Sequence, residues 1–102
     1  MALPVAYRLR VKHDLEAAFD WYEEQRSGLG GEFSASVQST FKAIELHPEL
    51  FASVYGEVRR AIMSRFPFAV FYLVEQKRIV VLRVLHTARN SELWPKPRNN
   101  VG

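Results

Sequence analysis

The sequence predicts an α+β domain in which a helical hairpin packs on one face of an antiparallel β-sheet. Three observations support this: apolar and polar residues alternate near the N-terminus, two stretches then show helical periodicity, and strand-like segments follow from residue 57 onward. A chain of 102 residues is long enough for one hydrophobic core and too short for a second. We therefore expect one domain over residues 1–94, with the element order β-α-α-β-β-β.

The first strand is predicted over residues 5–12, VAYRLRVK, because apolar and polar residues alternate there. Asp14 is a suitable N-cap for a helix over residues 14–27. Within that helix, apolar residues recur at the spacing i, i+3, i+4 and i+7, which places them on one face. These residues are Leu15, Ala18, Phe19 and Tyr22.

A second helix is predicted after the turn SGLGG at residues 27–31. Its apolar stripe consists of Phe33, Val37, Phe41 and Ile44. The helix should end at His47, because Pro48 disfavours helical geometry in the residue before it.

Three further strands are predicted over residues 57–65, 67–75 and 78–87, with Gln76 and Lys77 as a two-residue turn between the last two. The helices would cover one face of the resulting sheet. We expect the other face to be open and to carry the function. The tail over residues 95–102 is basic and has too little apolar content to pack by itself, so we expect it to be mobile.

The charge is distributed unevenly along the chain. The net charge is +3, but residues 1–54 carry five basic and eight acidic side chains, whereas residues 55–102 carry nine basic and three acidic ones. The two halves therefore have net charges of −3 and +6. A basic half indicates an anionic partner, which charge alone allows to be either nucleic acid or an acidic protein segment.

Composition excludes several classes of site. The chain has no cysteine, and its three histidines lie far apart in sequence, so we expect no disulfide, no metal site and no cofactor. The N-terminus lacks the apolar segment of a signal peptide, and the longest apolar run, residues 66–74, is about half a membrane span. We expect a cytoplasmic protein. No nucleophile-elbow, phosphate-loop, dinucleotide-binding, zinc-protease or EF-hand motif is present.

The arginines before the apolar run are candidate binding residues. In a strand, Arg59 and Arg65 would share one face and Arg60 would take the other, so at least one set must point outward. In the last strand, Arg83 would share a face with Ile79, Val81 and Leu85. A cation among apolar residues suggests a groove for an anionic ligand; the alternative is that such arginines keep an exposed face soluble.

Two residues near the C-terminus complete the set of candidates. His86, at the end of the last strand, is predicted to share a face with Val80, Leu82 and Val84, and histidine can act as a general acid or base near neutral pH. Trp94 follows the last strand and could fold back as a lid on the core. Alternatively, it forms part of a rim that binds a partner.

Three segments of the chain carry recognisable motifs: DLEAAFDWYEEQRSGLGGEF, IELHPELF and VRRAIMSRFPFAVFYLVEQKRIVVLRVLHTARNSELW. Through these segments, the sequence resembles the RelE/ParE superfamily of bacterial toxins over roughly residues 5–94. The resemblance implies the toxin half of a type II toxin–antitoxin pair, neutralised by a cognate antitoxin whose C-terminal segment wraps the toxin in a hetero-oligomer.

The superfamily divides into two branches. The RelE-like branch cleaves mRNA on the ribosome with basic side chains, and where that branch carries a characteristic arginine this chain has Ala69. Trp94 falls near that branch's C-terminal tyrosine, and an indole has no proton to exchange as an acid or base. The ParE-like branch binds DNA gyrase and needs a binding surface rather than catalytic groups, so the resemblance favours this branch.

We therefore predict a ParE-like toxin that inhibits growth by binding DNA gyrase. One alternative is a ribosome-dependent mRNA endonuclease, for which the candidate catalytic residues are His86, Arg83, Arg89 and Arg65. The other is a degenerate toxin that only binds its antitoxin. The residues predicted to bind the antitoxin or the target are Arg59, Arg60, Arg65, Arg83, His86, Arg89 and Trp94.

Overall fold

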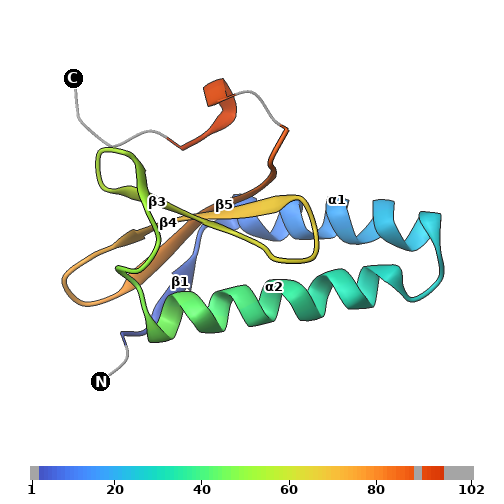
Figure 1. Cartoon of the computed structure of the whole chain (residues 1–102), viewed down its shortest axis with the longest axis horizontal. Coiled ribbons are helices and arrows are strands. Elements are labelled where there is room, and N and C mark those ends of the chain that lie inside the picture. Colours follow the sequence, from blue (N-terminus) through green and yellow to red (C-terminus); the bar gives the residue numbers. More distant parts are fainter. Residues whose placement is uncertain (1–2, 89–90, 96–102) are drawn as a thin grey trace.

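Two antiparallel helices lie across one face of a five-stranded sheet in the computed structural model, which describes residues 3–88 and 91–95 (Figure 1). The elements are β1 (Val5–Tyr7), α1 (Leu9–Gln25), α2 (Leu29–Leu46), β2 (Ser53–Tyr55), β3 (Val58–Ile62), β4 (Phe68–Val74), β5 (Ile79–His86) and a 3-10 helix (Ser91–Leu93). The strand order is β1-β5-β4-β3-β2. The predicted α+β class is confirmed, and β2 is a short additional strand that the sequence did not indicate.

The sheet is mixed rather than wholly antiparallel. Strands β3 to β5 form the predicted antiparallel meander, and β2 extends it by pairing antiparallel with β3. Strand β1, in contrast, pairs with β5 in parallel. The β4–β5 connection is the predicted two-residue turn, closed by a hydrogen bond from Glu75 N to Arg78 O of 2.8 Å. A parallel neighbour requires a crossover, and here the crossover consists of α1, α2 and the antiparallel strands.

The prediction of a strand over residues 5–12 was wrong. The strand ends at Tyr7 and α1 begins at Leu9. Leu9 is 75% exposed, so the alternation that suggested a strand does not reflect burial, while Val11 enters the core from the first turns of the helix. Asp14 is consequently not an N-cap: Arg8 holds that position, without a capping side chain.

The predicted helical hairpin is present, but α1 spans Leu9–Gln25 instead of residues 14–27, and Phe19 of its predicted apolar face is 37% exposed. The chain turns at Gly28, whose φ of +91° suits glycine, and Leu29 to Gly31 already belong to α2. The Glu23 carboxylate accepts hydrogen bonds from Gly28 N (2.8 Å) and Gly30 N (2.9 Å), so it satisfies free N–H groups at the start of α2. The helix ends at Leu46, immediately before His47 and the proline, as predicted.

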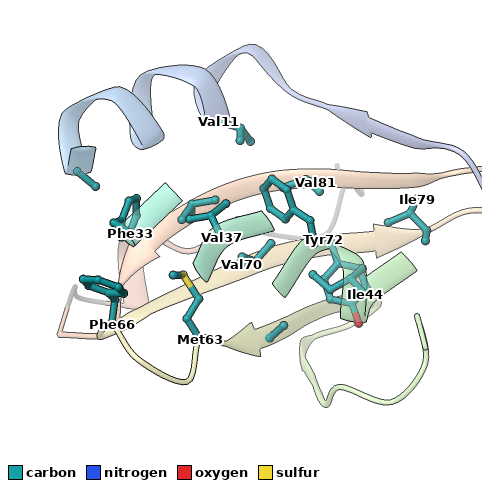
Figure 2. Packing of buried hydrophobic residues seen from close by; sticks show 14 of the residues in the cluster. Val11, Phe33, Val37, Ile44, Met63, Phe66, Val70, Tyr72, Ile79 and Val81 are labelled. Carbon is teal, nitrogen blue, oxygen red and sulfur yellow. The ribbon is translucent and has the colours of Figure 1, made fainter. Parts of the chain in front are cut away.

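The main core lies between the helices and the sheet (Figure 2). Its aromatic centre is formed by Tyr22, Phe33, Phe66 and Phe68, with ring centroids 4.9–6.1 Å apart. All four residues of the predicted α2 stripe are buried in this core. Among the described residues, no helix is long and apolar enough to cross a membrane.

The prediction that the other face of the sheet is open was wrong. A second buried cluster lies there, formed by Val58, Ala69, Phe71, Val80, Leu82 and Leu85. Trp94 packs on it, with its ring 5.3 Å from Phe71 and 6.2 Å from Tyr55. The prediction that Trp94 folds back onto apolar residues is therefore confirmed.

A β-bulge changes which residues of β5 share a face. Phe71 is paired with Arg83 and Tyr72 with Val81, so Leu82 is an extra residue in β5. As a result, Val84 belongs to the helix-side core and Leu85 to the second cluster, the reverse of the predicted assignment. A strict alternation of side chains could not have placed Arg83 and its neighbours correctly.

Candidate functional site

Arg59 points toward the helix side and holds the loop between α2 and β2. Its Nη1 atom donates hydrogen bonds to Phe51 O (2.7 Å) and Glu49 O (3.2 Å). Tyr72, which is fully buried, donates its hydroxyl proton to Pro48 O at 2.7 Å, and burial raises the pKa of this phenol to about 12. The half-buried Arg59 guanidinium is thus engaged by backbone carbonyls of the chain itself.

Arg60 lies on the opposite face of the sheet from Arg59, as the alternation predicted. Its guanidinium carbon is 4.8 Å from the centroid of the Trp94 ring, within the range of a cation–π interaction. Because Trp94 also packs on the second cluster, Arg60 helps to hold the C-terminal segment against the sheet.

Arg65 is occupied by an ion pair at the surface. Its Nη2 atom is 2.9 Å from Glu32 Oε1, and Arg26 Nη2 lies 3.4 Å from the other oxygen of the same carboxylate. The hydrogen bond from Arg65, supported by the charge of Arg26, lowers the pKa of Glu32 below its usual value. The arginines at 59, 60 and 65 therefore point to different places and do not form one cluster.

Arg83 is paired with Asp14 at the junction between α1 and β5. The guanidinium donates two hydrogen bonds to the carboxylate, of 2.9 and 3.0 Å, and the same carboxylate accepts a third from Val84 N at 2.9 Å. The hydrogen bonds from Arg83 to Asp14 raise the pKa of Arg83. Because β1 ends at Tyr7, the Asp14 side chain bonds an edge N–H of β5 that no β1 residue reaches.

A groove of about 790 Å³ runs along α1 and is closed on its other side by the ends of β4 and β5. We call it the α1 groove. Its walls include His13, Trp21, Phe68, Arg83 and His86, and Trp21 is 57% exposed. An exposed tryptophan in a groove is typical of a protein-binding surface.

His86 lies at one end of the α1 groove. Its ring packs against Phe68 at 5.2 Å, and its Nδ1 atom accepts a hydrogen bond from Ala88 N at 3.0 Å. Because Nδ1 acts as the acceptor here, Nε2 is the ring nitrogen that can donate a hydrogen bond.

The structure thus brings only some of the predicted site residues together. His86 and Arg83 line the same groove, whereas Arg59, Arg60, Arg65 and Trp94 lie elsewhere. Arg89 and the tail beyond Pro95 lie outside the described residues. Among the described residues, no group of three potential ligands could hold a metal ion.

Sequence reasoning missed the contribution of α1 to the site. Arg10, His13, Asp14 and Trp21 all border the α1 groove. The available signal was the basic run Arg8, Arg10 and Lys12, which lies where a helix normally has acidic residues. The prediction of a strand over these residues concealed that anomaly.

Comparison with known proteins defines the class of fold first. A solved structure titled "Chromosomal ParDE TA system from P. aeruginosa" superimposes with a TM-score of 0.65 and 20% sequence identity, covering 83% of this chain and 96% of the other. The architecture is thus that of a small α+β protein found in a toxin–antitoxin system. No curated protein matches the chain.

The sequence comparison is more specific. The family model "ParE toxin of type II toxin-antitoxin system, parDE" matches residues 5–91. The chain therefore belongs to the ParE toxin family of type II toxin–antitoxin systems, and the resemblance found in its motifs is confirmed.

Proposed function

We propose that this toxin inhibits growth by binding DNA gyrase in the cytoplasm, and that a cognate antitoxin neutralises it by forming a hetero-oligomer. The proposal is supported most directly by the environment of Ala69. According to the resemblance in sequence, the RNA-cleaving RelE-like branch carries an arginine at this position. In this chain the position is occupied by alanine, which is 1% exposed.

Ala69 is buried in the second cluster, near Phe71 and Leu85. A cation at position 69 would have to enter an apolar layer over which Trp94 packs. Cleavage of RNA requires a base for the 2′-hydroxyl and cations for the developing phosphorane charge. Around Ala69, this face of the sheet offers apolar side chains in place of such groups.

Two of the candidate catalytic cations, Arg83 and Arg65, also favour binding over cleavage. Arg83 is held by Asp14 and Arg65 by Glu32, so both guanidinium groups already have carboxylate partners. His86 borders the α1 groove without Arg65 beside it. A surface that acts by contact needs no such catalytic assembly.

The test is expression of the chain alone in bacteria, followed by two parallel measurements. Accumulation of gyrase-linked cleaved plasmid, with reporter mRNA intact, is the expected result. With purified gyrase, the chain should inhibit supercoiling, and addition of the antitoxin encoded beside it should restore activity. A gyrase variant that no longer binds the chain provides the matched control.

Other results would replace the proposal. Ribosome-dependent cleavage of reporter mRNA that disappears in His86→Ala would establish the endonuclease. Normal growth, with the antitoxin still bound by the purified chain, would indicate a degenerate toxin.

A further inference from the structure

The start of α1 has an unfavourable charge pattern. A helix N-terminus carries partial positive charge and is normally complemented by acidic or capping side chains. Here, Arg8 is the N-cap residue, Arg10 and Lys12 follow, no acidic residue lies in the first turn, and no side chain caps the helix. A local pattern that opposes the stability of its own element often marks a functional surface.

Of these cations, Arg8 and Arg10 border a second groove, of about 510 Å³, which we call the arginine groove. Among the described residues, its arginines are Arg8, Arg10, Arg78 and Arg83, and its acidic residue is Glu75. Its apolar lining includes Leu73, Leu82 and Trp94. The groove therefore combines a strongly basic rim with a hydrophobic floor.

Two of the four arginines are already neutralised. Arg78 Nε lies 2.9 Å from Glu75 Oε1, and Arg83 is paired with Asp14. In the part of the chain that the structure describes, Arg8 and Arg10 have no acidic partner, and both are exposed. The positive charge available to a ligand is thus concentrated at the start of α1.

We propose that the arginine groove binds an acidic amphipathic peptide segment of a partner protein. Carboxylates of the segment would pair with Arg8 and Arg10 and accept hydrogen bonds from the uncapped first turn of α1. Its apolar side chains would lie on the floor near Leu82 and Trp94. Because the partner protein would be the antitoxin, this inference rests on the proposed function.

The state of Trp94 favours a peptide over a nucleic acid. Single-stranded nucleic acids bind basic grooves by stacking their bases on aromatic rings. Trp94 already has the Arg60 guanidinium 4.8 Å from its ring centroid and the Phe71 ring at 5.3 Å. Its ring is therefore committed to the fold and offers a base little surface for stacking.

The test uses a fluorescein-labelled peptide of glutamate, leucine and alanine, about 12 residues long, which is enough for three helical turns. Matched probes replace glutamate by lysine, replace leucine by serine, or are single-stranded DNA of similar length. Anisotropy reports binding. In a Trp21→Phe background, the emission of Trp94 reports whether the described part of the groove is occupied.

The acidic leucine peptide should bind, shift the emission of Trp94 and be weakened by salt, because the groove contacts are electrostatic and apolar. Combined Arg8→Glu and Arg10→Glu replacement should weaken it about tenfold or more. The same replacement should leave the melting temperature unchanged or raised, since glutamate suits this end of a helix. Lys12→Glu, in the same helix but outside the groove, is the control and should leave binding unchanged.

Equal binding by the charge-reversed chain, no binding of the acidic peptide, or tighter binding of the DNA would overturn the inference. The gyrase assay separates this outcome from the proposed function. A chain that poisons gyrase yet does not bind the peptide refutes only the groove. A chain that binds the peptide at the groove but leaves gyrase unaffected refutes only the gyrase target.

Discussion

Removal of the Asp14 carboxylate should loosen the junction between α1 and the sheet. This carboxylate accepts two hydrogen bonds from Arg83 and one from Val84 N, all within 2.9–3.0 Å. The Asp14 side chain is 10% exposed and that of Arg83 20%. Asp14→Ala would therefore leave a guanidinium and a strand-edge N–H largely shielded from water and without their acceptor.

The expected cost follows from these contacts. Breaking a buried ion pair by removing one partner costs about 3–5 kcal/mol, and partial exposure of Arg83 places this pair near the lower limit. We therefore expect Asp14→Ala to reduce the free energy of unfolding by about 3 kcal/mol. At about 4 °C per kcal/mol for a domain of this size, the melting temperature should fall by roughly 12 °C.

The assay is urea denaturation of the purified chain, followed by circular dichroism. Asp14→Asn keeps an acceptor for Val84 N but removes the charge, so it should cost less than the alanine variant. Arg83→Met, combined with Asp14→Ala in a double-mutant cycle, should give a coupling energy of about 1.5 kcal/mol or more. A loss below about 1 kcal/mol in Asp14→Ala, or no coupling, would refute the assigned role.

Three further predictions concern packing and pH. Gly30→Ala should lower the free energy of unfolding by about 2 kcal/mol, because the added Cβ would lie 2.9 Å from the Phe19 carbonyl oxygen. Gly31→Ala, where the added Cβ meets open space, should raise it by about 0.5–1 kcal/mol. Equal melting temperatures of the two variants would contradict this. Trp94→Ala should cost about 2 kcal/mol in thermal unfolding by exposing the second cluster, and an unchanged midpoint would show that the cluster is covered without it. The pKa of Tyr72 is about 12 in the folded chain and near 10 in the unfolded chain. The free energy of unfolding should therefore be fully retained below pH 10 and fall by roughly 2–3 kcal/mol as the pH rises toward about 12. Denaturation midpoints measured from pH 8 to 12 should therefore fall above pH 10, and a flat profile would refute the burial argument.

Local periodicity was sufficient for much of the fold. The buried stripe of α2 and the end of this helix at Leu46 were predictable, because helical spacing and the restriction before Pro48 act within a few residues. The three main strands were found for the same reason, with the observed bounds of β3, β4 and β5 inside the predicted ranges. The motifs of the family were also local, and they identified the class of toxin.

Short local signals failed at the edge strand β1 and on the face of the sheet away from the helices. Residues 5–12 alternate as a strand would, yet the chain turns into α1 after Tyr7. The face away from the helices was expected to be open, yet Trp94 packs over Phe71. In both cases, packing against distant segments decides between conformations that the local pattern alone allows.

The sequence by itself determined both helices, the three main strands, the buried stripe of α2 and the family, because these depend on residues close together in the chain. The tertiary structure alone decided which arginines are engaged. The partner of Arg83 is 69 residues away, and the extra residue Leu82 in β5 reversed the faces beyond it. Three arginines that are close in sequence contact different parts of the fold. Arg59 bonds the loop before β2, Arg60 packs on the Trp94 ring, and Arg65 pairs with Glu32 of α2. Among the arginines of the described residues, Arg8 and Arg10 are left without an ion pair, and charge becomes available to a partner only where the fold leaves it unpaired.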